Sequence, residues 1–111
     1  MSVGGLEDEG LIVMEDQKLI SLVIPLFNEE EIVPMLSARV TEATRVQRVA
    51  FEIVVVDDGS TDSTADLVRG VSKVEPHIKL ISTVHRGKGW AVGIGMLDSN
   101  AEYRFLCDAD L

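Results

Sequence analysis

The sequence predicts an α/β fold in which a single parallel sheet carries helices on both faces, giving three layers. Short apolar runs alternate along the chain with segments whose apolar residues recur at helical spacing, in units of roughly thirty residues. The apolar runs are nearly continuous, which is typical of strands that are buried on both faces. These two observations indicate a Rossmann-like sheet of four parallel strands connected by three helices.

The beginning of the chain differs in composition from the rest. Residues 1–18 are interrupted by three glycines and charged by five acidic residues. We therefore expect a flexible acidic lead-in over residues 1–18 and a folded domain over residues 19–111.

Each of the first two predicted strands is followed by a helix. Residues 19–24 form an apolar run that closes at Pro25, and Asn28 followed by three glutamates is typical of a helix N-terminus. Residues 51–56 form the second run, which ends at Asp57-Asp58-Gly59-Ser60. A second helix is expected from about Ser63 onward.

The pattern repeats in the second half of the chain. Residues 78–82 form the third predicted strand, and the loop His85-Arg86-Gly87-Lys88-Gly89 leads from it into a third helix. Residues 103–107 form the fourth strand, which ends at Asp108-Ala109-Asp110-Leu111, where the chain stops. We therefore expect a sheet that is truncated after its fourth strand.

Polar clusters follow the predicted strands at the edge where parallel sheets bind ligands. The carboxylates after the second strand can accept hydrogen bonds from a base or ribose, or Asp62 can simply cap the next helix. Asp108 and Asp110 can hold a divalent metal against a phosphate, or be two solvated acids. Arg86 to Gly89 can contact a phosphate, or form a flexible turn. Together the clusters indicate a site for a phosphorylated ligand.

Charge and cysteine content exclude several classes of function. Ten basic residues against 19 acidic ones give a net charge of −9, which argues against nucleic-acid binding. An anionic substrate therefore needs local cations or a metal.

Cys107 is the only cysteine, so we expect a core thiol in a reducing compartment. No apolar run reaches the ~18–20 residues that span a bilayer, and no signal peptide is evident, so the chain is expected to be soluble.

In combination, these motifs resemble the amino-terminal, donor-binding half of a family 2 glycosyltransferase with the GT-A fold. The resemblance covers about residues 19–111 and rests on four segments in order: Val23-Ile24-Pro25-x-x-Asn28-Glu29-Glu30, Val54-Val55-Val56-Asp57-Asp58-Gly59-Ser60-x-Asp62, Gly87-Lys88-Gly89-x-Ala91-Val92 and Asp108-Ala109-Asp110-Leu111. Within the family, the sequence is most similar to polyprenyl-phosphate and dolichyl-phosphate sugar transferases. Two positions depart from the family pattern, with His85 where Asn is frequent and Gly93 where Arg is common.

The resemblance implies an inverting transfer of a hexose from a nucleotide-diphospho-sugar, of the UDP-glucose or GDP-mannose class, to a polyprenyl phosphate. It implies a nucleotide pocket shaped by Pro25, Asn28 and Glu29, a base contact from Asp57 with Asp58 nearby, Lys88 near the diphosphate, Asp108 at the ribose or metal, and Asp110 on Mg²⁺ or Mn²⁺. The complete enzyme would work in the cytoplasm, at the cytoplasmic face of a membrane.

The family's catalytic base lies beyond the Asp-x-Asp motif, so we expect no catalytic residue in this chain and no transfer by it alone. We also expect an exposed sheet edge at the fourth strand, through which copies self-associate. A non-catalytic nucleotide-binding or interaction fragment is the alternative. A signalling receiver domain is disfavoured, because its acids would follow the first and third strands. His77 and His85 lack partners at metal-binding spacing and are expected to be loop histidines.

Overall fold

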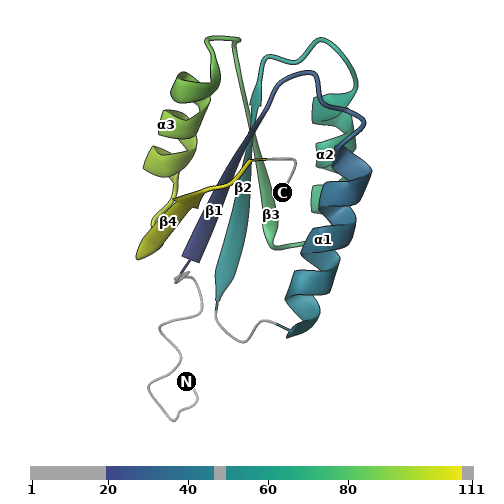
Figure 1. Cartoon of the computed structure of the whole chain (residues 1–111), viewed down its shortest axis with the longest axis vertical. Coiled ribbons are helices and arrows are strands. Elements are labelled where there is room, and N and C mark those ends of the chain that lie inside the picture. The colour runs from purple at the N-terminus through teal and green to yellow at the C-terminus, as the bar shows by residue number, and fades with distance from the viewer. Residues whose placement is uncertain (1–19, 47–49, 109–111) are drawn as a thin grey trace.

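The protein forms one parallel sheet with helices on both faces. A computed structural model describes residues 20–46 and 50–108. Its elements are β1 (Ile20–Leu26), α1 (Val33–Val46), β2 (Phe51–Asp58), α2 (Thr64–Val74), β3 (Ile78–Thr83), α3 (Lys88–Asp98) and β4 (Tyr103–Leu106). The strand order is β3-β2-β1-β4, with α3 on one face of the sheet and α1 and α2 on the other (Figure 1). The predicted three-layer α/β fold is confirmed, whereas the expected lead-in over residues 1–18 lies outside the described residues.

Two apolar cores lie on opposite faces of the sheet. Strand β2 runs through the middle, and its residues alternate between the two cores because successive side chains point to opposite faces. The larger core, under α1 and α2, contains Ile24, Leu26, Val33, Leu36, Val40, Phe51, Ile53, Val55, Val68 and Ile78. The smaller core, under α3, contains Val23, Val54, Val56 and Ala91. Cys107 packs partly buried against the larger core, as predicted for a core thiol.

Helix α3 packs very closely against the sheet. A Cβ atom added at Gly95 would lie well inside van der Waals contact with Val23 Cγ1, and 3.0 Å from Val56 Cγ2. Both valines are completely buried and have no room to move. Gly95 therefore permits a helix-to-sheet distance that no larger residue allows, whereas a Cβ at Gly93 would meet nothing within 4 Å.

Strand β1 extends further than its sequence predicts. The strand was expected to close at Pro25 but continues through it to Leu26. The Val23 carbonyl accepts a hydrogen bond from Cys107 N–H, so Pro25, two residues on, also turns its backbone toward the β4 side. β4 pairs with β1 only from Ile20 to Val23. The next bond of this parallel ladder would run from a backbone N–H at position 25 to the Cys107 carbonyl, and proline lacks that N–H, so the pairing ends at Val23.

Helix α1 begins later than predicted. Asn28 was expected to cap it, but the helix starts at Val33. Asn28 has φ 51° and uses its side chain to bind the loop after β2, so it is unavailable as a cap. Pro34 is the second residue of the helix, where a missing N–H costs little.

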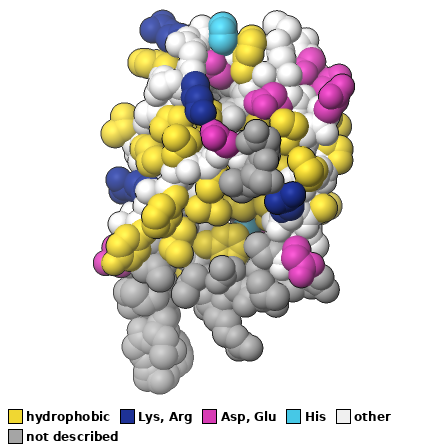
Figure 2. All heavy atoms as spheres, viewed as in Figure 1, with side chains coloured by type: hydrophobic (Ala, Val, Ile, Leu, Met, Phe, Trp, Pro, Cys, Tyr) yellow, Lys and Arg dark blue, Asp and Glu magenta, His cyan; other side chains and the backbone are white. Residues whose placement is uncertain are grey.

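Strand β4 forms one edge of the described sheet, where it pairs only with β1. Tyr103, Phe105 and Leu106 are each about half exposed. Hydrophobic side chains gather over β4 on the face seen in Figure 2. The expected exposed edge at the fourth strand is thus present in the described part of the chain. None of the helices over residues 20–46 and 50–108 combines the length and apolar character needed to cross a bilayer.

Candidate functional site

A cavity of about 490 Å³ opens at the carboxyl ends of the strands. Each of the four strands contributes either its last residue or the residues that follow it, which is where a parallel sheet is expected to bind a ligand. The lining residues are Pro25, Leu26, Phe27, Glu29, Asp58, His85, Gly87, Lys88 and Asp108. Among the residues predicted from the sequence, Pro25, Glu29, Asp58, Lys88 and Asp108 meet at this cavity, whereas Asn28 and Asp57 do not line it and Asp110 lies outside the described residues.

Asp58 organises the loop between β3 and α3. Its carboxylate is only 2% exposed. One oxygen accepts the Arg86 N–H at 2.9 Å, and the other accepts the Gly87 N–H at 3.0 Å and lies 2.9 Å from His85 Nδ1. Burial acts to raise the pKa of Asp58, but these hydrogen bonds to the charged form outweigh it, so the pKa lies below its ordinary value. Asp58 is therefore held as a carboxylate with both of its oxygens occupied.

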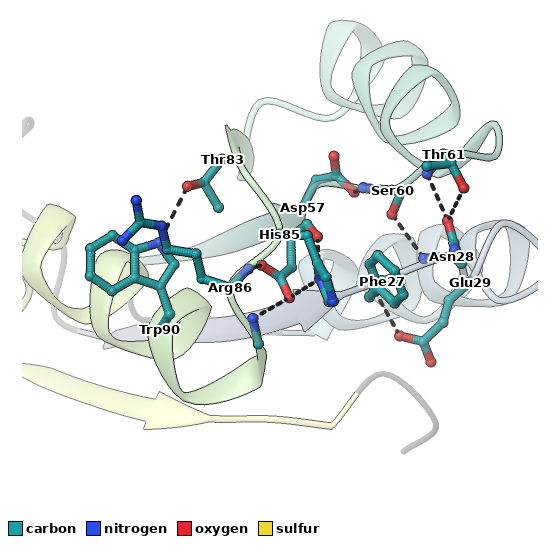
Figure 3. Close-up of polar contacts among 12 residues, drawn as sticks. Phe27, Asn28, Glu29, Asp57, Ser60, Thr61, Thr83, His85, Arg86 and Trp90 are labelled. Carbon is teal, nitrogen blue, oxygen red and sulfur yellow. Dashed lines mark hydrogen bonds and ion pairs between the residues drawn. The ribbon is translucent and has the colours of Figure 1, made fainter.

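His85 joins Asp58 to the wall of the cavity. Its Nδ1 lies 3.1 Å from the Asp58 carbonyl oxygen as well as 2.9 Å from the carboxylate. Both partners are acceptors, so Nδ1 must carry a proton. The imidazole also stacks on Phe27, with ring centroids 4.0 Å apart and planes inclined by 18° (Figure 3). As predicted, His85 lies in a loop, but the sequence did not place it at the site.

Gly59 allows the loops after β2 and β3 to touch. It has φ +72°, a left-handed conformation that glycine adopts readily. A Cβ atom at this position would lie 2.5 Å from the His85 backbone nitrogen and 3.0 Å from its Cα. Backbone cannot move aside as a flexible side chain would, so glycine at position 59 is required for the observed place of His85.

Asn28 holds together the loops after β1 and β2. Its side-chain oxygen accepts the Thr61 N–H at 2.8 Å and the Asp62 N–H at 3.3 Å, and its own N–H donates to Ser60 Oγ at 2.8 Å (Figure 3). Asp57 is 4% exposed and accepts the Ser60 N–H at 3.3 Å. Both predicted nucleotide-binding residues thus stabilise the loops behind the cavity in this structure.

Asp62 sits at the start of α2. Its carboxylate accepts the Thr64 N–H at 2.9 Å and bonds the Thr64 hydroxyl. The hydrogen bond from that hydroxyl is the main reason that the pKa of Asp62 lies below its ordinary value, and burial opposes it. Because Ser63, the residue before the helix, makes no capping hydrogen bond through its side chain, Asp62 supplies the acceptor that the helix start needs.

Lys88 and Asp108 face each other at the edge of the cavity. Lys88 Nζ lies 2.8 Å from Asp108 Oδ1, and both side chains are 60% exposed. Asp108 offers a hard oxygen ligand of the kind that Mg²⁺ and Mn²⁺ prefer. Asp110, the second expected ligand, lies outside the described residues, and within those residues no group of three or more His, Cys, Asp or Glu side chains gathers as a metal site. The side chains present therefore fit a metal that takes further ligands from outside the described residues, not one held by this cavity wall alone.

Arg86 and Trp90 contact each other next to residues that line the cavity. Arg86 lies over the Trp90 ring, 4.9 Å from its centroid, and Trp90 is about half exposed.

Burial, and to a lesser extent the charge of Asp108, raises the pKa of the Cys107 thiol, so this thiol stays protonated at neutral pH. Cys107 is therefore no candidate nucleophile.

Comparison with known proteins identifies the family. The family model for "Glycosyl transferase family 2" matches residues 21–111. The chain belongs to glycosyl transferase family 2. The family resemblance noted from the motifs is thereby confirmed, and the matched region includes every residue of the cavity.

Individual relatives agree with this assignment. The undecaprenyl-phosphate 4-deoxy-4-formamido-L-arabinose transferase of Aeromonas hydrophila is 35% identical over 99 residues, which cover 86% of this chain and 30% of that protein. The mannosyltransferase PcManGT of Pyrobaculum calidifontis, solved with GDP-Man and Mn²⁺, has a TM-score of 0.68 at 26% identity and covers 85% of this chain and 28% of that one. S. aureus TarS 1-349, solved with UDP, has a TM-score of 0.70 at 24% identity over 83% of this chain and 27% of that one, and shows the shared fold. The chain spans about 30% of the length of the curated relatives it matches.

Proposed function

We propose that this chain binds a nucleotide-diphospho-sugar, and that it is the donor-binding part of an inverting transferase that passes a hexosyl group to a polyprenyl phosphate. In that reaction the acceptor phosphate oxygen forms a bond to the anomeric carbon while the bond from this carbon to the diphosphate breaks. The relatives that are named for undecaprenyl phosphate support the acceptor class. PcManGT, which was solved with GDP-Man, supports the donor class.

One observation carries the proposal. The four motifs of the family resemblance, which are far apart in the sequence, contribute side chains to a single cavity at the carboxyl ends of the strands. A family assignment alone would support a fold and leave the site open. The convergence of Pro25, Asp58 and Lys88 on one cavity supports a specific place for the donor.

The proposed roles follow from where each side chain lies. Pro25 and Glu29 would border the nucleotide, and Lys88 would face the diphosphate. Asp58 would act mainly through the loop it holds, because both of its oxygens already accept hydrogen bonds. Asn28 and Asp57 would likewise act through the loops that they hold together. The base contact expected from Asp57 stays part of the proposal.

A divalent metal, Mg²⁺ or Mn²⁺, belongs to this proposal. Asp108 would hold it from the end of β4, together with Asp110. Bound there, the ion would act as a Lewis acid that neutralises charge on the leaving diphosphate. The Mn²⁺ in the PcManGT structure supports the class of ion. Because a polyprenyl phosphate resides in a lipid bilayer, we place the complete reaction at a membrane surface, on its cytoplasmic face.

Calorimetric titration tests the donor-binding function. UDP, UDP-glucose and GDP-mannose are each titrated into the chain with and without Mn²⁺ or Mg²⁺. We expect metal-dependent binding of one nucleotide, lost in Asp108→Ala and in Asp110→Ala. Asp66→Ala is the control, because Asp66 forms an exposed ion pair with Arg69 on α2, away from the cavity.

The same titration separates the alternative of a fragment that binds a nucleotide without taking part in catalysis. Nucleotide affinity that is unchanged in both Asp108→Ala and Asp110→Ala would favour that alternative, because binding would then need no metal. No binding of any nucleotide to a folded sample, with or without metal, would contradict the proposed function. We also expect no sugar transfer to a polyprenyl phosphate by this chain alone, and measurable turnover would overturn that expectation.

We further propose that copies of the chain associate through β4. An edge strand presents unpaired backbone groups, and three of the four β4 side chains are half-exposed apolar residues. A second copy could add its own β4 alongside this edge.

A further inference from the structure

The wall of the cavity is acidic, although its proposed ligand is an anion. It contains the carboxylates of Glu29, Asp58 and Asp108 against the ammonium of Lys88. Lys88 is itself 2.8 Å from Asp108 Oδ1. A diphosphate would therefore meet a net negative wall, and besides the divalent metal proposed above, a positive charge on the wall itself would favour its binding.

His85 is the side chain of this wall that can supply such a charge near neutral pH. Its Nδ1 donates to Asp58, while its side chain as a whole remains 55% exposed. Within the described residues no protein group bonds Nε2, which leaves this nitrogen open to take up a proton from solvent. The charged groups that line the cavity with His85 are Asp58 on β2, Glu29 after β1, Lys88 at the start of α3 and Asp108 after β4, and Arg86 is its neighbour in the sequence.

We propose that His85 is a positioning residue of the donor pocket that also makes donor binding depend on pH. Through Nδ1 and Asp58 it fixes the loop that carries Gly87 and Lys88, and through its ring it holds Phe27 at the cavity wall. When Nε2 takes up a proton, the ring adds one positive charge to the wall that faces the diphosphate. This inference rests on the proposed function, because it assumes that the cavity receives a nucleotide-diphospho-sugar.

The molecule contains a matched control for this arrangement. His77 lies before β3, whereas His85 lies after it, so the two histidines are at opposite ends of one strand. The Nδ1 atom of His77 is 2.8 Å from Glu75, and its ring stacks on Phe51 at 4.6 Å and 19°. His77 thus has the same two kinds of contact as His85 without lining the cavity.

The test measures the Kd of a nucleotide sugar at about pH 6 and about pH 8, with saturating Mg²⁺. A nucleotide sugar is used rather than UDP, because its diphosphate has no terminal group that titrates in this range. We expect the native chain to bind about fivefold more tightly at the lower pH, as one added charge at a partly solvated wall predicts. His85→Asn retains a donor for Asp58 and should bind without this pH dependence. His85→Phe retains the stack alone and should bind weakly at both pH values, and His77→Asn should behave as the native chain does.

Three outcomes would overturn the inference. The first is equal affinity of the native chain at both pH values, and the second is a pH dependence that persists in His85→Asn. The third comes from nitrogen NMR of the native chain, which should show neutral His85 with its proton on Nδ1; a proton on Nε2 would contradict the hydrogen bonds to Asp58. Absence of nucleotide-sugar binding at either pH would overturn the proposed function and this inference together, whereas binding without pH dependence would overturn this inference alone.

Discussion

At the scale of single residues, Asp58 has the most polar contacts of the cavity residues that the structure describes. It is buried, ionised and bonded to three groups of one loop. Because its pKa is lower in the folded chain than in the unfolded chain, the unfolded chain takes up a proton first as the pH falls. The contribution of Asp58 to stability is therefore present above the ordinary carboxyl pKa and is lost as the pH drops through the lowered folded value.

Asp58→Asn tests this contribution. An amide has one acceptor oxygen where the carboxylate has two, and its NH₂ group would face the N–H of Arg86 or Gly87. We expect the free energy of unfolding to fall by about 1–3 kcal/mol at neutral pH. The difference from the native chain should begin to shrink as the pH falls through the ordinary carboxyl pKa of about 4, where the unfolded native chain takes up a proton, and should disappear only below the lowered pKa of the folded chain.

Urea unfolding at several pH values measures this effect. Asp66→Asn is the control, since Asp66 makes an exposed ion pair with Arg69 and should change stability by less than about 1 kcal/mol. A loss in Asp58→Asn that stays constant down to about pH 3 would show that the charge of Asp58 is not what stabilises the loop.

The residues of the cavity could be predicted only in part from the sequence. Polar groups at strand ends predicted the edge of the sheet, and Pro25, Glu29, Asp58, Lys88 and Asp108 do line the cavity. The role of His85 could not be predicted, because its contact with Asp58 joins two loops 27 positions apart in the sequence. The replacement of the usual Asn by His next to Arg-Gly-Lys-Gly was the available signal.

At the scale of elements, α3 gives a paired prediction from its two interior glycines. Gly93 has open space where a Cβ would be, so Gly93→Ala should raise the free energy of unfolding by up to about 1 kcal/mol through helix propensity. Gly95→Ala has the same propensity gain but would push against the buried Val23 and Val56, and should lower stability by about 1–3 kcal/mol.

Urea midpoints of the two variants decide this prediction. Each variant serves as the control for the other, because both make the same chemical change in one helix. Equal changes in stability would mean that α3 does not approach the sheet as closely at Gly95 as the structure shows.

The elements also show where local sequence patterns succeed and where they fail. Continuous apolar runs predicted all four strands. β1 and β2 are largely buried, as that pattern indicates, whereas β4 is exposed although its run is also apolar. The predicted start of α1 was wrong. Asn28 followed by glutamates fits a cap locally, but its side chain bonds Thr61, 33 positions away, and the helix begins five residues later at Val33. Long-range contacts of this kind leave no periodic signal.

At the scale of the whole molecule, the β4 edge predicts association between copies. We expect light scattering to show an apparent mass that rises with concentration, and an apolar dye to bind. Phe105→Lys should reduce both, because a charge on an edge strand opposes pairing with another strand. Val74→Lys should leave both unchanged, since Val74 is 81% exposed at the end of α2, away from β4. A native chain that remains a monomer and binds no dye would contradict the proposed self-association.

The strand order has a consequence for how the site is assembled. β1 and β4 are neighbours in the sheet, although they are the first and the last of the described strands. Their opening residues, Ile20 and Tyr103, are paired but lie roughly 80 positions apart in the sequence. During synthesis, β1, β2 and β3 can pair before β4 has left the ribosome, and with them form the contacts of Asp58 and His85. Asp108, which follows β4, is the last of the cavity residues to arrive. Loss of β4 by local unfolding would accordingly remove the Asp108 wall of the cavity first, while the loops around His85 remain folded.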